Sequence, residues 1–309
     1  MIKSISLVIA LFFAGSSWAR EPITIYFNTA VTASNYASYL KAVAIANKNQ
    51  NKYQFQIEVK AGANGLLAVR AMDEKPESSL ATAAASFVEN ARAGLINEKD
   101  YVAVAAQGDA CWGVISTVGN TSQGISSLQG RKDMSVGTTG PGNVTHLTVL
   151  TLGEKYGFSV RFVGFKSSRD AVLTMVAGES LDIAMDSIKS YTAFKERNPR
   201  LQLLGVSCPR RHPLAPEIKT LAEQGFNMPS VFLVTLANIK MPEQKRREIE
   251  SIMEQAQAEL GSEFLFETAD LYPPQFDKPK RSAQQYFEQK VAQVKSLQNR
   301  FRQQIELAK

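Results

Sequence analysis

A regular alternation of short apolar runs with helical patterns, which occurs twice, limits the fold of this 309-residue chain more than any other feature. Runs such as residues 23–27 (ITIYF) are rich in β-branched and aromatic residues and lead through polar loops into helical patterns. The same order restarts at residues 134–137, and a late strand pattern follows at residues 231–235. Such alternation is typical of α/β folds. We therefore predict two lobes, each a mostly parallel sheet flanked by helices, joined by two crossing segments.

The predicted elements follow this plan along the chain. Strands are predicted at residues 23–27, 55–59, 80–84, 102–106, 112–116, 134–137, 161–165, 183–186, 201–206 and 231–235. Helices are predicted from Ser34 onward, within 66–72, near 87–93, at 143–156, from the cap residue Ser168 to Gly178, and as two amphipathic helices near the C-terminus. The crossing segments are expected near residues 108–111 and 206–209.

The first nineteen residues have the pattern of a secretory signal peptide. Lys3 supplies the positive charge, residues 5–14 form an apolar run, and Ser17 and Ala19 are the small residues of a cleavage site. The run is shorter than the ~20 apolar residues that span a bilayer. We predict cleavage after Ala19 and export of a soluble protein.

The two cysteines lie at the predicted boundaries between the lobes. Lobe 1 is expected to comprise residues 20–110 and 208–309, including the C-terminal helices, and lobe 2 residues 111–207. Cys111 and Cys208 then both lie at the hinge, and an oxidising compartment permits them to pair. Two separate buried thiols are the alternative, because nothing local to either cysteine requires a bond.

Composition and motifs argue against several classes of function. The net charge of +6 comes from scattered basic residues that do not alternate with aromatic residues, as a nucleic-acid groove would require. The two histidines, His146 and His212, lie far apart, and no HExxH, CxxC or GxSxG motif is present. We therefore expect no nucleic-acid partner, no metal, no cofactor and no enzymatic activity. His146 is interpreted as a capping residue in the first turn of its helix.

Two predicted strand-to-helix loops, at residues 28–35 and 138–146, could bind an anion. Each brings a helix N-terminus, with its unpaired amide N–H groups, to the carboxyl edge of a sheet. In the second loop (GTTGPG), Gly140 and Gly142 allow the backbone to approach a ligand closely. An ordinary βα turn is the alternative interpretation of this pattern. The loop has neither the P-loop nor the dinucleotide-binding fingerprint.

Several features from residue 136 to residue 187 recur together in one known family. They are the glycine turn of Gly140 and Gly142, the pair His146 and Leu147 at a helix start, residues 165–167 (FKS) after a strand, the helix end at Gly178, and Leu181 and Asp182 with Asp186. Residues 58–69 (EVKAGANGLLAV) and 206–226 match further family segments in the same order. The chain thus resembles the periplasmic solute-binding receptors of tripartite tricarboxylate transporters, the Bug/TctC family.

The resemblance implies a type II periplasmic-binding fold whose two lobes close on a ligand. In this family the ligand is a small organic anion, such as a di- or tricarboxylate, an aromatic acid or an amino acid, held by amides and hydroxyls of the two loops. The implied location is the periplasm, and the implied partners are the permease subunits of the transporter. The first loop departs from the family, because residues 28–33 (NTAVTA) lack its glycines and Asn35 replaces its Asp.

We predict ligand contacts from three loops and one strand end. They are Thr29, Ala30 and Ser34 in the first loop, Ala85 and Ser86 in the third βα loop, Thr139, Gly140, Gly142, Asn143 and Thr145 in lobe 2, and Asp186. Asp186 is assigned to a ligand hydroxyl, amine or bridging water. The predicted function is capture of a carboxylate by a monomeric receptor, which delivers it to a membrane permease. The alternatives are a receptor for an ABC or TRAP importer or a sensory system, an exported enzyme on the same scaffold, and a scaffold whose lobes no longer open.

Overall fold

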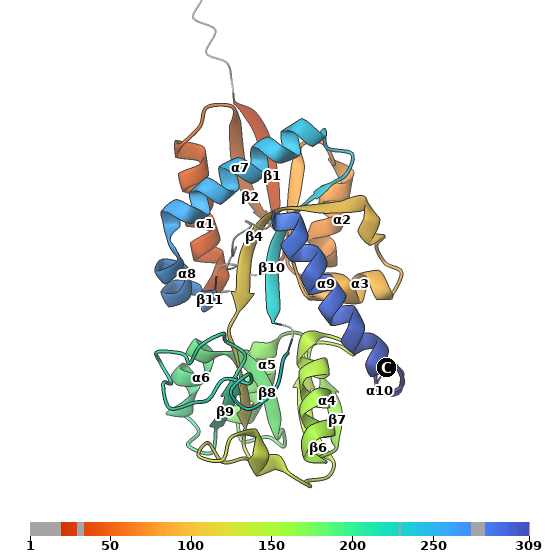
Figure 1. Cartoon of the computed structure of the whole chain (residues 1–309), viewed down its shortest axis with the longest axis vertical. Helices are drawn as coiled ribbons and strands as arrows, with labels where there is room; N and C mark the ends of the chain where they lie inside the picture. The colour runs from red at the N-terminus through yellow and green to blue at the C-terminus, as the bar shows by residue number, and fades with distance from the viewer. Residues whose placement is uncertain (1–19, 30–33, 229, 273–281, 309) are drawn as a thin grey trace, which may run out of the picture.

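The computed structural model describes residues 20–29, 34–228, 230–272 and 282–308. It has two lobes, one above the other in Figure 1, and each lobe contains one sheet. The predicted signal peptide, residues 1–19, lies outside the described residues. Of the helices in the described ranges, none combines the length and the apolar character that crossing a membrane requires.

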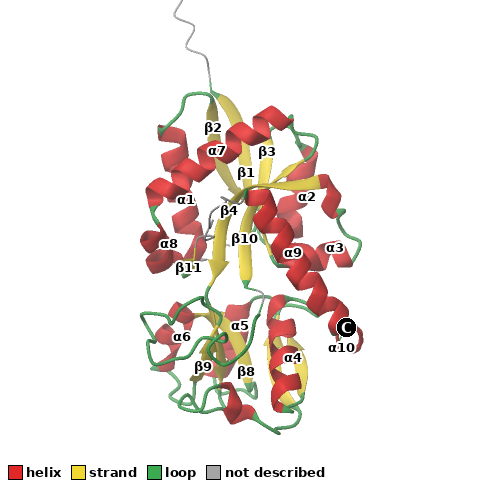
Figure 2. Cartoon of the chain, viewed as in Figure 1, coloured by secondary structure: helices red, strands yellow, loops and turns green. Residues whose placement is uncertain are grey.

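The elements follow the predicted order, and Figure 2 shows helices on the outside of both sheets. The strands are β1 Glu21–Phe27, β2 Tyr53–Val59, β3 Ser79–Ala84, β4 Tyr101–Ala110, β5 Trp112–Ser116, β6 Met134–Thr138, β7 Val160–Gly164, β8 Ile183–Ser187, β9 Gln202–Val206, β10 Val231–Asn238 and β11 Leu271–Tyr272. The helices are α1 Ser34–Lys48, α2 Leu66–Glu74, α3 Ser86–Arg92, α4 Val144–Tyr156, α5 Ser168–Val176, α6 Ile188–Lys195, α7 Glu243–Leu260, α8 Ser262–Ala269, α9 Ala283–Arg300 and α10 Arg302–Leu307.

The sheet of lobe 1 has the strand order β11-β4-β10-β3-β1-β2. β1 pairs in parallel with β2 and β3, and its side chains alternate between the two faces. Ile23, Ile25 and Phe27 pack beneath α1 and α7, whereas Tyr26 packs with α2, α3 and α9 on the other face. Both faces are therefore buried, which explains why the strands are apolar along most of their length.

The sheet of lobe 2 has the order β7-β6-β8-β5-β9. β6 is parallel to β7 and β8, with Val136 opposite Ile183. One face is covered by α4 through Val149 and Leu152. The other face is covered by α5 and α6. The predicted α/β class is thus confirmed for both lobes.

Both sheets are mixed, whereas mostly parallel sheets were expected. The chain crosses from lobe 1 to lobe 2 through β4 and β5, which are separated only by Cys111. β4 runs antiparallel to β10, and β5 runs antiparallel to β8 and β9. Parallel pairing is confined to the strands linked by helices, namely β1 with β2 and β3, and β6 with β7 and β8. The antiparallel pairs arise because the chain must leave one lobe and later return to it.

Some details of the helices correct the sequence analysis. α5 is capped by Ser167, whose hydroxyl accepts the Asp170 N–H at 3.1 Å, and not by Ser168. The last predicted helix is divided at Phe301 into α9 and α10. The short helices α6 and α8 were not predicted, because about two turns give little periodic signal.

A disulfide joins Cys111 to Cys208, whose Cα atoms lie 4.7 Å apart. The Cys111 N–H donates to the Asp270 carbonyl at 2.8 Å, and the Asp270 carboxylate lies 3.1 Å from His212 Nε2. All four side chains are buried. Of the two alternatives that the sequence left open, the structure has the bonded pair, and it lies where the chain crosses between the lobes.

The C-terminal helices start on lobe 1 and end on lobe 2. In Figure 1, α9 runs from the sheet of lobe 1 toward α4. Phe301 and Ile305 lie in one apolar cluster with Val144 and Leu147 of α4. The Gln298 side chain donates to the Gly142 carbonyl at 3.0 Å. The end of the chain therefore links the two lobes on one side.

The segment between β9 and β10 packs on lobe 2. Ala215 and Ile218 lie in the core beneath α5 and α6, and Leu221 and Phe226 lie in the core beneath α4. The predicted boundary at 207/208 assigned this segment to lobe 1. We propose that lobe 2 continues to about residue 230, because the apolar side chains of this segment are buried there.

Loss of the disulfide should lower stability without changing the fold. Closing a loop of 97 positions restricts the unfolded chain, and removing such a bond costs roughly 2–5 kcal/mol. We expect the double variant Cys111→Ala/Cys208→Ala to have a free energy of unfolding in urea that is lower by that amount. Wild type unfolded in excess dithiothreitol is the control and should match the variant. Equal curves for oxidised wild type and the variant would contradict the prediction.

Candidate functional site

The carboxyl edges of the two sheets face the boundary between the lobes (Figure 1). β1 and β3 of lobe 1 end there and continue into residues 28–35 and 85–86. β6 and β8 of lobe 2 end there from the opposite side, and α4 lies against α9. The two loops that the sequence singled out are therefore brought to one boundary, on opposite sides.

The loop between β6 and α4 is held by its own side chains. Asn143 Oδ1 caps α4 by accepting the His146 N–H at 2.8 Å, and it also accepts the Thr138 hydroxyl at 3.0 Å. Asn143 Nδ2 donates to Thr139 Oγ1 at 2.7 Å. Thr139 Oγ1 accepts this bond and donates to none of the described residues, so its hydrogen is available to a ligand. The partly exposed Thr139 hydroxyl is a donor suited to an anion.

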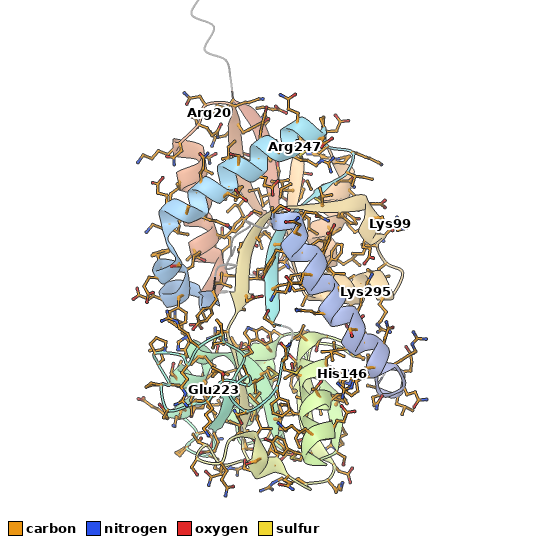
Figure 3. The ribbon with its side chains drawn as sticks, in the orientation of Figure 1. Arg20, Lys99, His146, Glu223, Arg247 and Lys295 are labelled. Atoms are coloured by element: carbon orange, nitrogen blue, oxygen red, sulfur yellow. A yellow bond between two sulfur atoms is a disulfide. The ribbon has the colours of Figure 1, made fainter. Side chains whose placement is uncertain are left out.

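His146 fixes the same loop from within α4, below the end of α9 (Figure 3). Its Nδ1 accepts the Gly142 N–H at 2.8 Å, and Gly142 has a φ of 84°, which a side chain would strain. Burial, with a smaller effect of nearby Arg92, lowers the pKa of His146 to about 4. The ring is therefore neutral near pH 7, with the proton on Nε2. The sequence predicted His146 as a capping residue, but the N-cap of α4 is Asn143, and His146 instead binds the loop that precedes the helix.

Asp186 lies at the end of β8, the strand beside β6. Its side chain is 7% exposed, and Oδ1 accepts the Ser187 N–H at 2.8 Å and the Ser168 hydroxyl at 3.3 Å. Oδ2 is buried and has no hydrogen-bond partner among the described residues. Burial raises the pKa of Asp186, although these hydrogen bonds oppose it. Leaving a carboxyl oxygen buried and unpaired costs stability, and such groups are concentrated at functional sites.

Glu89 reaches the glycine loop from lobe 1. It lies in the first turn of α3, and a Cβ atom added to Gly140 would come within 2.7 Å of Glu89 Oε1. Glu89 Oε2 is buried and has no partner among the described residues. Burial raises the pKa of Glu89 to about 7, against the opposing charge of Arg92, which also pairs with Glu306 at 3.3 Å. A side chain at position 140 would displace the end of Glu89, so Glu89 lies against the glycine loop.

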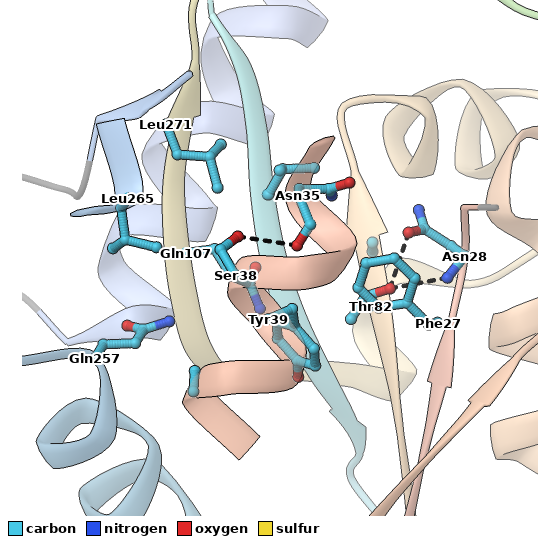
Figure 4. A pocket seen from close by; sticks show the side chains of 13 residues that line it. Phe27, Asn28, Asn35, Ser38, Tyr39, Thr82, Gln107, Gln257, Leu265 and Leu271 are labelled. Carbon is cyan, nitrogen blue, oxygen red and sulfur yellow. Dashed lines mark hydrogen bonds between the residues drawn. The ribbon is translucent and has the colours of Figure 1, made fainter. Parts of the chain in front are cut away.

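The lobe 1 side of the boundary begins with a buried polar pair. The Asn28 N–H donates to Thr82 Oγ1 at 2.9 Å, and the Thr82 hydroxyl donates to Asn28 Oδ1 at 2.8 Å (Figure 4). These bonds tie the end of β1 to β3. They also orient the start of the first loop, where the buried Thr29 hydroxyl has no partner among the described residues. Residues 30–33 of that loop lie outside the described residues.

A cavity of about 20 Å³, room for one water molecule, lies between this pair and α1 (Figure 4). A β-bulge places Gln107 in its wall, since residues 233–234 of β10 oppose residues 106–108 of β4. Gln107 Nε2 donates to Thr235 Oγ1 at 2.6 Å, whereas buried Oε1 has no partner among the described residues. The lobe 1 edge therefore also carries polar groups that a ligand or water could satisfy.

The predicted contact residues fall into three groups. Thr139, Gly140, Gly142, Asn143 and Asp186 lie together at the lobe 2 edge, Thr29, Ser34, Ala85 and Ser86 lie in the loops at the lobe 1 edge, and Thr145 is buried in the first turn of α4. Ala30 lies outside the described residues. Whether these residues contact a ligand stays a prediction.

Sequence reasoning missed Glu89 and Gln107. Gly108, which has a φ of 130°, is the signal that could have indicated the bulge beside Gln107, because glycine within a strand often marks a bulge. Glu89 has no comparable signal. Its role depends on contact with a loop that lies about fifty residues later in the chain.

Comparison with known proteins identifies one curated relative of this chain. The UPF0065 protein in the tcbD-tcbE intergenic region of Pseudomonas sp. strain P51 is 29% identical over 131 residues. This match covers 41% of the present chain and 36% of the relative, so the chain spans little more than a third of that relative's length. No protein-family model matches the chain.

Solved structures share the fold over nearly the whole chain. The TctC solute binding protein from Polaromonas has a TM-score of 0.67 at 17% identity, covering 90% of this chain and 98% of its own. MatC from Rhodopseudomonas palustris, solved with bound malate, has a TM-score of 0.67 at 16% identity, with the same coverage. The chain thus has the two-lobed type II periplasmic-binding fold of solute-binding proteins. Within that class its structural neighbours are TctC-type binding proteins, so the resemblance to the Bug/TctC family is confirmed.

The buried Glu89 carboxyl should make stability depend on pH. The pKa of Glu89 is about 7 in the folded protein, against an ordinary value of 4.5. Its contribution to the free energy of unfolding is therefore complete below pH 4.5 and is lost as the pH rises through 7. The shift corresponds to about 3 kcal/mol. We expect Glu89→Gln to remove this loss, so that the variant gains stability relative to wild type between pH 5 and pH 8 in urea unfolding. The exposed Glu179→Gln change is the control, and a pH-independent effect of Glu89→Gln would contradict the prediction.

Proposed function

We propose that this protein is a periplasmic receptor that captures a small organic carboxylate between its lobes and delivers it to a tripartite tricarboxylate-type permease. The two-lobed fold and the likeness to TctC and MatC support the proposal, and MatC was solved with malate. The observation that carries it is the Thr139 hydroxyl. Asn143 holds this hydroxyl as a donor at the lobe 2 edge, beside the N-terminus of α4.

Closure of the two lobes is the proposed mechanism. A ligand carboxylate would accept a hydrogen bond from the Thr139 hydroxyl of lobe 2. The other end of the ligand would meet the Thr29 hydroxyl of lobe 1, which has no partner within the described ranges. Contacts with both lobes form together only when the lobes are close, so a bridging ligand favours the closed state. The release of ligand to a permease would then require the lobes to separate again.

The rival functions use the same site in different ways. A receptor for an ABC or TRAP importer or a sensory system would bind its ligand in the same way as the proposed receptor. It would differ only in its membrane partner. An exported enzyme would need a nucleophile or an acid–base pair. Cys111 is joined to Cys208 by a disulfide, so it offers no free thiol. His146 is fully buried and its Nδ1 accepts the Gly142 N–H, so the ring offers no exposed base. The geometry therefore favours binding over catalysis.

Loss of the Thr139 hydroxyl should weaken ligand binding. Mature protein stripped of co-purified ligand by unfolding and refolding is screened by thermal shift against mono-, di- and tricarboxylates and amino acids. A ligand at 100 times its dissociation constant stabilises the fold by about 2.7 kcal/mol, a shift of a few degrees. For the compound that binds, we expect Thr139→Val to lower affinity roughly tenfold or more, as for a lost hydrogen bond to a charged group.

Thr151→Val is the matched control for this experiment. The Thr151 hydroxyl donates to the Leu147 carbonyl at 2.9 Å within α4, away from the loop. The control should bind as wild type does. Equal affinity of wild type and Thr139→Val for the best ligand would contradict the proposed site, and no shift with any compound would contradict the receptor function.

Delivery to a permease requires a separate measurement. Cells that lack this chain should lose uptake of the identified acid at concentrations near its dissociation constant, and the wild-type chain should restore uptake. The Thr139→Val variant should restore uptake only at higher acid concentration, because the receptor is then less occupied. Unchanged uptake without the chain would contradict a transport role and favour a sensory one.

A further inference from the structure

We infer that the lobe 2 edge carries an ammonium-binding subsite, in which Asp186 Oδ2 pairs with the amine of an amino-carboxylate ligand. The inference rests on the proposed receptor function and narrows its ligand class to amino acids. It starts from Asp186 Oδ2, which no described residue satisfies and which lies at the same sheet edge as the Thr139 hydroxyl.

The ends of two neighbouring strands bring Asp186 to the same edge as the proposed carboxylate donor. Val136 of β6 is paired with Ile183 of β8 in parallel. Thr139 directly follows the last residue of β6, and Asp186 is the last residue but one of β8, so both lie where these strands end. Neighbouring strands are about 4.8 Å apart, a distance that one small amino acid can span. A single ligand could therefore place its carboxylate on Thr139 and its amine on Asp186.

The protein's own cations do not satisfy Asp186. Among the described residues no ion pair involves Asp186, whose partners are hydroxyl and amide groups on Oδ1. Lys189, three residues further along the chain, donates instead to the Glu267 carbonyl and pairs with Asp270 at 3.9 Å. Arg169 lies over the Phe194 ring, 5.5 Å from its centroid, and its charge acts on Asp186 from a distance without forming an ion pair with it. A direct cationic partner for Asp186 Oδ2 would therefore come from outside the chain.

Burial makes a cationic partner more favourable at this position than at the surface. Asp186 is 7% exposed, so water cannot fully solvate its carboxylate. An ionised group in such a place is stabilised strongly by an opposite charge and is costly without one. An ammonium group brings that charge together with hydrogen-bond donors, whereas a second ligand carboxylate would repel Asp186.

Glu89 adds a second carboxyl group on the other side of the same loop. Its Oε1 lies against Gly140, and its buried Oε2 has no partner among the described residues. Arg92 lies near the loop as well, where it pairs with Glu306. With carboxyl groups on both sides of residues 138–143, the boundary favours a zwitterion over a ligand that carries only carboxylates.

The test compares ligands that differ in one substituent. Calorimetry on ligand-stripped wild type uses three series: succinate, malate and aspartate; glutarate, 2-hydroxyglutarate and glutamate; propionate, lactate and alanine. We expect the amino member of at least one series to bind tenfold or more tighter than both the hydroxyl and the unsubstituted members. A hydroxyl or unsubstituted acid that binds as tightly as its amino analogue overturns the subsite but leaves the receptor function standing. Failure of all nine compounds to bind overturns both.

The Asp186→Asn variant then tests whether the preference for the amino ligand depends on the Asp186 carboxylate. The change keeps the shape of the side chain and should lower affinity for the amino ligand tenfold or more, while affinity for the unsubstituted acid changes less than threefold. Asp182→Asn is the control, because Asp182 precedes β8 and its carboxylate accepts the Ser135 N–H at 2.7 Å. If Asp186→Asn lowered the affinity for all members of a series equally, the role of Asp186 would be structural, and the subsite would be overturned. The comparison on wild type stands even if a variant fails to fold.

Discussion

A disulfide between Cys111 and Cys208 fixes the point at which the chain passes between the two sheets. Asp270 strengthens this point, because its carbonyl accepts the Cys111 N–H and its carboxylate contacts His212 and Lys189. The covalent bond and these buried polar contacts hold β4, β5, β9 and β11 together at one place. The carboxyl edges of both sheets consequently face one boundary, and every feature proposed for binding depends on that arrangement.

Several unsatisfied polar groups lie near this boundary. The buried Thr29 hydroxyl, Gln107 Oε1, Glu89 Oε2 and Asp186 Oδ2 have no hydrogen-bond partner among the described residues. Folded proteins seldom leave buried polar atoms unpaired, because each costs stability. Their positions near the carboxyl edges of the two sheets support a ligand site there, because binding would offset that cost. The proposed receptor function and the ammonium subsite both follow from this chemistry.

Much of the fold could be predicted because its signals are local. The apolar run of β1, the N-cap Asn143 and the left-handed Gly157 that ends α4 each act within one or two turns of chain. Short helices such as α6 gave too little periodicity to be recognised. The antiparallel strands were also missed, since strand direction depends on where a distant segment returns and not on the pattern of the strand itself.

The sequence by itself determined the two strand–helix units, the glycine loop before α4 and the likeness to one receptor family, because periodicity, capping and turn chemistry act between near neighbours. Only the tertiary structure decided that Cys111 bonds to Cys208 and that Glu89 lies against Gly140. It also decided that a β-bulge places the Gln107 side chain in the wall of a cavity. Each of these contacts joins residues that are far apart in the chain. Such contacts exist only after the apolar faces of both sheets have been buried and have fixed where the strands end.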